Sequence, residues 1–456
     1  MGTVAVVGAG LTGLGAAWRL KSNGHSVTVF EGSSCVGGSI STHRESGYLV
    51  EEGPNTIQLT SQENENWLEE IGLGPAAQDA DARAGKRFLV RNGRAIAVPG
   101  SPAEFVFTPL FSWNAKLRLI GEIFTPNADP ETEESLSEFV IRHLGEEMLD
   151  YAIDPFVGGV YAGDPNQLSV RYGFPKLYQL EQKYRSLILG SIALRRERKR
   201  SGTLYKTRLI SFADGLQTLP DKLADGLSDS VKLGHAISGI EFNGQWRLRT
   251  ETTGNTDSDV YDAVVLALPA HALSEVLVNG QSEFAPFSEI ESPPVTCFSF
   301  GFRRDQVGHP MDGLGALIPS REPFNILGTL FSSSLFEGRA PDGHVLLTTF
   351  VGGTRSPDTA TQPTDVLREI VLTDLRRLFQ VDGEPSFAHR RTWSRAIPQY
   401  QVGHGRFIDY MQICENRYPG LKIGGNARDG ISLSYCIEGG RRLADETEAF
   451  LTDSTK

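Results

Sequence analysis

Near its N-terminus the sequence reads Val4-Ala5-Val6-Val7-Gly8-Ala9-Gly10-Leu11-Thr12-Gly13. The apolar run at the start is typical of a parallel strand that is buried on both faces. Helical periodicity follows over residues 14–20 and stops at Gly24. A second apolar run, 27–30, ends at Glu31. The pattern therefore predicts a strand, a turn with a GxGxxG motif, a helix and a second strand.

The three glycines of the motif have distinct physical roles. Gly8 makes the tight turn, Gly10 lets the backbone approach a pyrophosphate, and Gly13 lets helix and strand pack closely. The helix N-terminus offers free N–H groups and a positive dipole to the phosphates. Glu31 stands where an acid accepts hydrogen bonds from a ribose hydroxyl, which favours FAD or NAD over NADP. The alternative, a glycine-rich turn without a ligand, does not explain why all these features occur in this order.

A second glycine pair follows the acid. Gly37-Gly38 and Thr42 form a GGxxxT pattern, which resembles the pair that lets the backbone pass FAD in flavoproteins of the amine-oxidase superfamily. An NAD dehydrogenase has no use for it, and the remaining alternative is a surface turn. The superfamily usually has Arg two residues before the pair, where this chain has Cys35, so any contact of that Arg with the cofactor is lost.

The composition excludes several classes of protein. The chain has 456 residues and a formal net charge of -12, which makes a nucleic-acid partner unfavourable. Its four cysteines lie far apart, which excludes a zinc ribbon and a disulfide framework. It has no run of about 18 apolar residues that would span a membrane. A signal peptide would destroy the first motif, so we expect a cytoplasmic protein of two or three domains.

Seven later segments carry further motifs. In chain order they are 47–56 (with EEGPN), 155–164 (with VYAGD), 215–220 (GLQTLP), 331–336, 344–350, 397–404 (IPQY and GH) and 425–438. Together they resemble the protoporphyrinogen oxidases, FAD enzymes near the end of haem and chlorophyll synthesis. The resemblance covers nearly the whole chain, and several of its motifs are specific to that family.

The resemblance and the apolar pattern agree on an α/β fold with a Rossmann-like FAD-binding domain built from discontinuous segments. We assign residues 1–75, 215–272 and 402–456 to it. The run 261–269 would return the chain to the nucleotide sheet, and 231–241 is interpreted as a strand pair. A short strand at 421–423 precedes glycines and a helix from about Cys436 to Leu451.

Two excursions leave this domain. A strand-rich substrate domain is assigned to 76–90, 190–214 and 273–401, with antiparallel strands at 296–302, 325–331 and 345–351. A helical domain, for which membrane contact is an open alternative, is assigned to 91–189. Helical periodicity covers 135–149 and 174–198.

The motifs supply the candidate cofactor-binding residues, which belong to five short segments and one isolated position. They are Gly8, Ala9, Gly10, Leu11, Thr12, Gly13, Glu31, Gly32, Gly37, Gly38, Ser39, Gly53, Pro54, Asn55, Thr56, Ile237 (near the adenine), Gly425, Asn426, Gly430, Ile431, Ser432 and Leu433.

The resemblance also implies the reaction. The flavin accepts a hydride from a methylene bridge of protoporphyrinogen IX and is reoxidised by O₂ to give H₂O₂; three rounds yield protoporphyrin IX. Because the cofactor does the redox chemistry, we expect no catalytic side chain and no metal. The nine His lack ligand-like spacing, and His404 is interpreted as a structural hydrogen-bonding residue.

A porphyrinogen is a flat apolar disc with carboxylates at its edge, so it requires apolar walls and a cation. Arg87 matches the family Arg that binds a propionate, and Leu317, Leu330 and Phe350 match positions that clamp the tetrapyrrole. Gly158 and Gly159 would let substrate or flavin lie close to the backbone. Without the resemblance, Leu317, Leu330 and Phe350 would be interpreted as ordinary residues of the hydrophobic core.

The stretch 99–124 is rich in Phe, Leu and Trp but too short to span a bilayer. In the family this region lies on the membrane surface and admits an apolar substrate; a packed core helix or a substrate lid is the alternative. The basic run 195–200 would face anionic lipid or form a solvated helix end. The sequence leaves open a homodimer, contact with the inner face of the membrane, and a downstream tetrapyrrole enzyme of the ferrochelatase type as partner.

Three other functions compete. Coproporphyrinogen III, with four propionates, is the rival substrate. A flavin amine oxidase would carry a Lys on the strand near 295–299, where this chain has none. A non-catalytic tetrapyrrole-binding flavoprotein would keep the FAD motifs but would oxidise a porphyrinogen only slowly.

Overall fold

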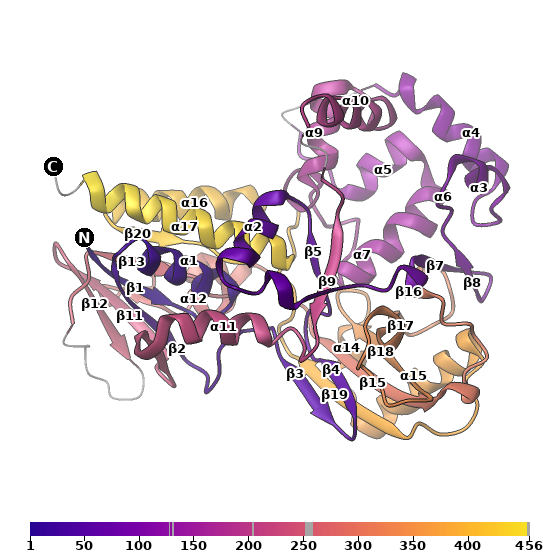
Figure 1. The fold of residues 1–456 in the computed structure, drawn as a ribbon. Coiled ribbons are helices and arrows are strands. Elements are labelled where there is room, and N and C mark those ends of the chain that lie inside the picture. The colour runs from indigo at the N-terminus through magenta and orange to yellow at the C-terminus, as the bar shows by residue number, and fades with distance from the viewer. Residues whose placement is uncertain (127, 130–131, 203–204, 251–258, 454–456) are drawn as a thin grey trace.

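The computed structural model describes residues 1–126, 128–129, 132–202, 205–250 and 259–453. Figure 1 shows three regions: a sheet region that holds both termini, a helical region beside it, and a second sheet region below the helices. We call them the nucleotide-sheet region, the helical region and the large-sheet region.

The nucleotide-sheet region is built on a five-stranded parallel sheet with the order β10-β2-β1-β13-β20. Its strands come from distant parts of the chain, as the apolar runs predicted. Their bounds are β1 Thr3–Val7, β2 Ser26–Glu31, β10 Val231–Leu233, β13 Ala263–Leu266 and β20 Leu421–Ile423.

Helices cover one face of this sheet and a small sheet with further helices covers the other. The first layer holds α1 (Leu11–Ser22), α11 (Thr218–Leu227) and α17 (Leu433–Asp453). The helix α17 begins three residues before the predicted Cys436, and it crosses α1 at Gly440, where a Cβ would lie 2.8 Å from the Thr12 carbonyl. The opposite layer holds β11 (Ile237–Phe242), β12 (Trp246–Thr250), β14 (Leu277–Val278), α12 (Ala270–Leu273) and α16 (Gly405–Arg417).

The prediction that residues 231–241 form a pair of strands is wrong, because the two strands of this segment do not pair with each other. β10 adds to the edge of the parallel sheet beside β2, whereas β11 pairs with β12 in the separate sheet. Gly234, with φ +71°, turns the chain between them, and the His235 N–H bonds to the Glu31 carbonyl. A positive φ at glycine costs little, so the chain leaves one sheet and enters another within a few residues.

The large-sheet region contains a seven-stranded sheet with the order β19-β15-β18-β17-β16-β7-β8. The three predicted antiparallel strands are confirmed as β15, β17 and β18. The apolar face, with Phe298, Phe300 and Phe331, packs against α15 (Thr364–Phe379). The strand bounds are β7 Lys86–Arg91, β8 Arg94–Ala97, β15 Val295–Arg303, β16 Gly313–Leu317, β17 Ile326–Phe331, β18 His344–Gly352 and β19 Phe387–Trp393.

The helical region differs from the predicted boundaries in two places. β8 extends the large sheet to Ala97, beyond residue 90, because it pairs with β7 as a hairpin. Residues 190–200 belong to a helix that packs against α9, so they lie with the helices and not with the substrate sheet. The region holds α3 Pro102–Phe107, α4 Trp113–Gly121, α5 Leu136–Leu144, α6 Glu146–Met148, a π-helical turn Leu149–Ile153, α7 Asp154–Val160, α8 Val170–Gly173, α9 Pro175–Tyr184 and α10 Leu187–Arg200.

Two small sheets connect the regions. One has the order β5-β9-β6 and the other is the hairpin β3-β4. In Figure 1, β5 and β9 run between the nucleotide-sheet region and the two others. Their bounds are β3 Thr42–Glu45, β4 Tyr48–Glu51, β5 Ile57–Leu59, β6 Ala77–Asp79 and β9 Arg208–Phe212.

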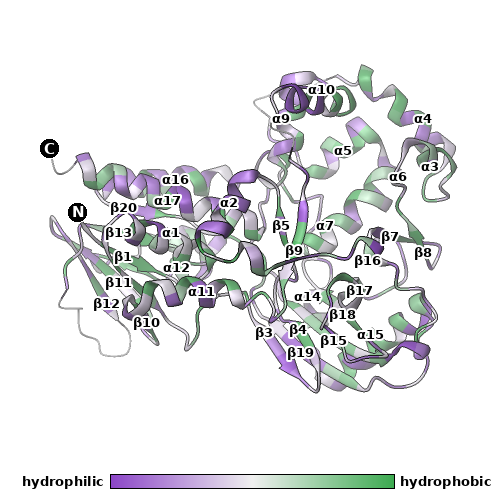
Figure 2. Cartoon of the chain, in the orientation of Figure 1, coloured by the Kyte–Doolittle hydropathy of each residue, from purple (hydrophilic) through white to green (hydrophobic). Residues whose placement is uncertain are grey.

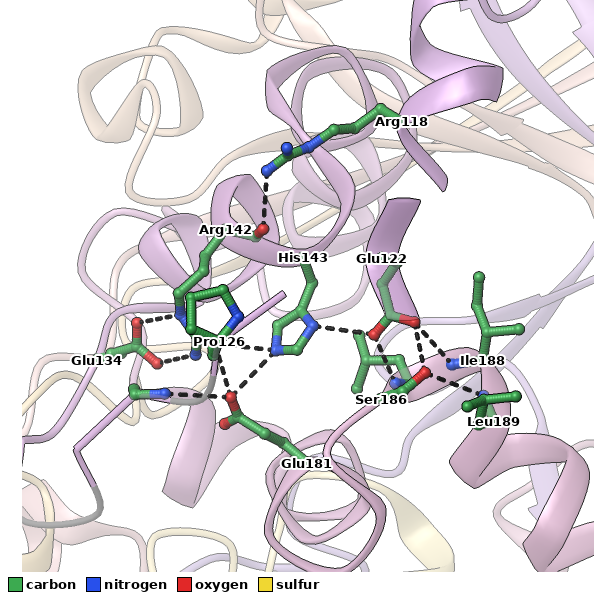
Figure 3. Close-up of polar contacts among 12 residues, drawn as sticks. Arg118, Glu122, Pro126, Glu134, Arg142, His143, Glu181, Ser186, Ile188 and Leu189 are labelled. Carbon is green, nitrogen blue, oxygen red and sulfur yellow. Dashed lines mark hydrogen bonds and ion pairs between the residues drawn. The ribbon is translucent and has the colours of Figure 1, made fainter. Parts of the chain in front are cut away.

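A buried polar network fastens the helices of the helical region to one another (Figure 3). Nδ1 of His143 lies 3.0 Å from Oε1 of Glu122, and its Nε2 lies 3.1 Å from Oε1 of Glu181. Glu122 also accepts hydrogen bonds from the Ser186 hydroxyl and the Leu187 N–H at the start of α10. Arg142 bonds to Glu181 at 2.6 Å. All partners are satisfied by one another, as burial of charge requires.

Within the described residues, no helix combines the length and the apolar character that crossing a membrane would require.

Candidate active site

The turn after β1 has the geometry that phosphate binding requires. A Cβ at Gly8 or Gly13 would collide with backbone oxygens, so both glycines serve packing. A Cβ at Gly10 would meet no protein atom within 4 Å, so the backbone there is open to a close approach. Gly10 is the N-cap of α1 and makes no side-chain cap bond, which leaves the first N–H groups of the helix for an anion.

Glu31 lies at the end of β2 beside this turn. Its Oε2 accepts a hydrogen bond from the Ala9 N–H at 2.8 Å, and its Oε1 accepts one from the Ser33 N–H at 2.9 Å. Gly32 packs against Ala236, because a Cβ at Gly32 would lie 3.2 Å from the Ala236 Cβ. Ile237 follows directly and is buried, so the structure brings this residue to the acid end of β2.

The second glycine pair lies against the first motif. The Gly37 N–H donates to the Ala9 carbonyl at 2.9 Å, and a Cβ at Gly38 would lie 3.3 Å from the Gly10 Cα. Both glycines have positive φ, +114° and +62°. The pair therefore packs against the turn after β1. Cys35 is exposed.

Glu51 ties three motifs together, and this role was not predicted. Its carboxylate accepts hydrogen bonds from the Thr42 hydroxyl at 2.6 Å and from the Leu216 N–H at 2.9 Å, and it lies 3.4 Å from the Arg339 guanidinium. Burial raises the pKa of Glu51, and the bond from Thr42 and the charge of Arg339 oppose that rise only in part. The signal was present in the sequence, since Glu51 ends an otherwise apolar strand, but its partners are distant in the chain.

The segment 53–56 follows Glu51 and lies beside the glycine pair. A Cβ at Gly53 would collide with the Ser39 carbonyl, so only glycine fits there. The Asn55 side chain donates to the Gly53 carbonyl at 2.9 Å. The Trp393 indole N–H donates to the Glu52 carbonyl at 2.7 Å, which fixes the segment against the large sheet.

The C-terminal segment 425–433 is held by two residues of the IPQYxxGH motif. The Tyr400 hydroxyl donates to the Asn426 carbonyl at 2.5 Å, and His404 Nε2 lies 2.9 Å from the Ala427 carbonyl. The two rings stack with centroids 4.4 Å apart. Burial lowers the pKa of His404, which agrees with the predicted structural role rather than with that of a base.

The start of α17 reaches the segment after Thr56. Gly425 and Gly430 have positive φ, and they shape the turn that leads to the helix at Leu433. The Ser434 hydroxyl donates to the Gln58 carbonyl. The predicted residues Ile431 and Ser432 lie in this turn, and the start of α17 packs against β5, which follows segment 53–56.

One face of the large sheet carries the predicted substrate residues. The registers align Leu317 with Gly328 and Gly328 with Phe350, and they place Leu330 opposite Gly315 and Thr348. Strand alternation puts these side chains on the face opposite α15. Arg87 belongs to the same face, because its neighbour Phe88 packs into the α15 core. Gly315 and Gly328 lie between these side chains, and a Cβ at Gly328 would lie 3.1 Å from the Leu317 side chain.

Arg87 is exposed at the edge of this face. No hydrogen bond or ion pair engages its guanidinium within the described part of the chain. A charged group without a protein partner is free to bind a carboxylate.

The glycines of α7 lie against the same face. A Cβ at Gly159 would collide with Leu317, and a Cβ at Gly158 would lie 2.9 Å from the Arg355 guanidinium. The Gln399 side chain of the IPQY motif donates to the Tyr161 carbonyl at 2.9 Å, next to α7. Gln399 thus joins the VYAGD segment to the flavin-side motif, a contact that the sequence did not reveal.

The strand predicted to face the flavin in amine oxidases is β15, and it contains no Lys. Cys297 on this strand is buried beneath the Glu51 carbonyl, and burial raises the pKa of its thiol to about 12. A thiol of such high pKa stays protonated and unreactive at neutral pH.

The residues present fit FAD. A dinucleotide cradle is formed by the open space at Gly10, the uncapped start of α1, the second glycine pair and Glu31. The residue before segment 53–56 contacts the large sheet through Trp393.

Comparison with known proteins also indicates a flavin-dependent oxidoreductase. The sequence pattern of the flavin containing amine oxidoreductases matches residues 11–447. The chain is 36% identical over 480 residues to protoporphyrinogen oxidase 2, chloroplastic/mitochondrial, of Arabidopsis thaliana, covering 98% of this chain and 94% of that protein. It is 28% identical to the coproporphyrinogen III oxidase of Bacillus subtilis, covering 98% of each.

A crystal structure of a protein from Exiguobacterium sp. 255-15 superimposes with a TM-score of 0.80 at 23% identity, covering 98% of this chain and 99% of that one. At this identity the likeness concerns the fold.

Proposed function

The chain belongs to the flavin-containing amine oxidoreductase family and, within it, to the protoporphyrinogen oxidases, and from this premise we propose that it oxidises protoporphyrinogen IX to protoporphyrin IX. Its cofactor is FAD, and we assign O₂ as the electron acceptor. The observation that carries the proposal is the sheet face with Arg87, Leu317, Leu330 and Phe350. Cys297, which is paired with Phe350, contacts the Glu51 carbonyl just before segment 53–56.

The residues around the first motif hold the cofactor. The N–H groups at Gly10 and the start of α1 bind the pyrophosphate, and the Glu31 carboxylate accepts a hydrogen bond from a ribose hydroxyl. Gly37 and Gly38 let the backbone pass close to the cofactor. Glu51 holds the segments that contain Thr42 and Leu216 together, because its carboxylate accepts a hydrogen bond from each of these two residues.

The large sheet positions the substrate. Leu317, Leu330 and Phe350 form the apolar wall for the tetrapyrrole, and Arg87 binds a propionate at its edge. Bound flavin supplies the acceptor for a hydride from a methylene bridge. We assign no proton-transfer side chain, since Cys297 is held neutral and His404 bonds to backbone.

Coproporphyrinogen III remains the second candidate substrate. A relative that bears this name covers the chain as completely as the plant enzymes do, at lower identity, 28% against 36%. Four propionates instead of two would require more cations around the substrate.

A parallel turnover assay decides between them. FAD-loaded protein is given each porphyrinogen in air, and porphyrin fluorescence and H₂O₂ are followed. Preference for protoporphyrinogen with about three peroxides per porphyrin is expected. Preference for coproporphyrinogen would assign the protein to the oxidation of coproporphyrinogen III instead. If the protein oxidises neither porphyrinogen, the proposal is contradicted.

The outer edge of the helical region supports peripheral membrane contact as part of the proposal. Phe107, Trp113, Leu117, Ile120 and Phe124 are between 62% and 83% exposed on α3, α4 and the turn that follows. Green apolar stretches on α4 are visible at this edge in Figure 2. Contiguous exposed apolar surface of this kind marks a lipid or protein interface.

We also propose that such contact places the protein at the inner face of a membrane, where an apolar porphyrin can pass to a downstream tetrapyrrole enzyme. A homodimer is compatible with the acidic surface.

A further inference from the structure

A cluster of metal-ligating side chains lies outside the FAD and substrate residues. His43 and Glu45 belong to β3, and His389 belongs to β19. Each offers one ligand atom, and these atoms lie within 4.8 Å of one another. The two strands are in different sheets, so the cluster joins the β3-β4 hairpin to the edge of the large sheet.

One distance between ligand atoms already suits a small ion. His43 Nε2 lies 3.1 Å from Glu45 Oε2. Two ligands of a tetrahedral Zn²⁺ ion, with bonds of 2.0–2.1 Å, lie about 3.3 Å apart. A hydrogen bond in the metal-free protein thus has nearly the length of one edge of the coordination tetrahedron.

One of the His rings must rotate before both can share an ion. Their centroids are 4.2 Å apart and their planes are only 14° apart, so a single ion cannot lie in both ring planes as they stand. The side chain of His43 is 35% exposed, whereas that of His389 is 18% exposed. His43 is therefore the ring that has room to turn about its side-chain bonds.

A carboxylate fixes the other ring. Glu52 Oε1 lies 2.8 Å from His389 Nε2, and Glu52 Oε2 accepts a bond of 2.6 Å from the Ser41 hydroxyl. Carboxylates that orient ligating His in this way are a regular part of zinc sites.

The surrounding charge is suited to a cation. Glu45 and Glu52 supply two negative charges, and Arg391 opposes them with one positive charge near Glu52. The neighbouring Arg44 points its guanidinium to Asp214, 3.0 Å away.

We propose that His43, Glu45 and His389 bind one divalent transition-metal ion of the Zn²⁺ type, with Glu52 orienting His389. Imidazole and carboxylate ligands select such an ion, and three protein ligands leave one position for water. The ion would cross-link β3 to β19. Through Glu52 it would also stiffen the start of segment 53–56.

Calorimetric titration tests the site. FAD-loaded full-length protein, freed of metal with a chelator, is titrated with Zn²⁺, and Co²⁺ is added separately to record visible absorption. One Zn²⁺ per chain and a tetrahedral Co²⁺ spectrum are expected. His43→Ala and His389→Ala should lose both signals, and Glu52→Gln should weaken the affinity roughly 10- to 100-fold.

Two variants control for other ligands on the surface. His25→Ala removes a partly exposed His elsewhere, and Cys35→Ser removes the exposed thiol. Both should bind Zn²⁺ as the parent does. Flavin absorbance and the melting temperature show that each variant is folded, and Glu45→Gln provides a second test if a His variant is not. Absence of stoichiometric binding, or equal binding after loss of either His, would overturn the proposal.

Discussion

Arg87 is an exposed cation on the sheet face that carries Leu317, Leu330 and Phe350, and we assign it to the substrate rather than to the cofactor. We expect Arg87→Ala to lower kcat/KM for the porphyrinogen about 10- to 100-fold, mainly through KM, since a charge-assisted hydrogen bond is worth about 1.5–3 kcal/mol. The flavin content should not change. Steady-state kinetics with flavin absorbance measure both quantities.

Arg94 provides the matched control for this substitution. It is an exposed Arg on the neighbouring strand β8, and Arg94→Ala should leave KM unchanged. Equal losses of flavin and activity in Arg87→Ala would contradict the substrate assignment.

Gly10 differs from the other motif glycines because a side chain there meets no protein atom. Gly10→Val should therefore fold but lose FAD, since the added methyls occupy the path of the pyrophosphate. Flavin absorbance of the purified protein and its circular dichroism are the measurements. Gly121→Val, at another glycine whose Cβ meets nothing, is the control and should stay yellow. A fully yellow Gly10→Val protein would refute the phosphate-turn assignment.

Glu51 is a buried carboxylate with three partners. Removal of one partner from a buried pair leaves an uncompensated charge, so Glu51→Ala should lower the free energy of unfolding by about 3–5 kcal/mol. Denaturant unfolding measures the loss. The double variant with Arg339→Ala should lose less than the sum of the single variants. Strict additivity would show that the pair does not act together.

At the scale of elements, the network of Figure 3 makes the helical region sensitive to acid. Burial tends to raise the pKa values of Glu122 and Glu181. Hydrogen bonds from Ser186 and Leu187 to Glu122, and from Arg142 to Glu181, outweigh burial and hold both pKa values below the usual range. A carboxyl with a lowered folded-state pKa stabilises the protein above its unfolded pKa. That stability is lost as pH falls through the folded value.

We therefore expect hydrogen exchange of α5, α9 and α10 to accelerate as pH is lowered below about 4.5, relative to the intrinsic rate. Glu122→Gln should be less stable at pH 7 and should show a smaller loss of stability between pH 7 and acid pH. Glu63→Gln, on an exposed side chain of α2 (Gln62–Glu70), is the control. An unchanged pH dependence in Glu122→Gln would contradict this account.

At the scale of the whole molecule, the exposed apolar side chains of α4 gather at one outer edge. Leu117→Asp with Ile120→Asp should reduce co-sedimentation with anionic phospholipid vesicles by more than about tenfold, because each buried Leu or Ile contributes about 1.5–3 kcal/mol. Val366→Asp, on the outer side of α15 and 48% exposed, should bind vesicles as the parent does. Vesicle binding that is unaffected by both changes would exclude this edge as the membrane surface.

The sequence predicted the elements whose signal is local. Short sequence patterns predicted the strand and glycine turn of residues 4–13 and the strands β13 and β20. They also predicted β15, β17 and β18 of the large sheet. These predictions were possible because buried strands need continuous or alternating apolar residues. The FAD motifs followed from the same local rule, since phosphate binding needs glycines and a helix start at fixed spacing.

The sequence determined by itself that this is a dinucleotide-binding α/β protein with the motifs of a flavin oxidase. Only the tertiary structure decided what those motifs contact. It separated β10 from β11, it made Glu51 the joint of three segments, and it brought His43 to His389. Such contacts depend on how sheets from distant parts of the chain meet, and no short-range pattern of side chains encodes that meeting.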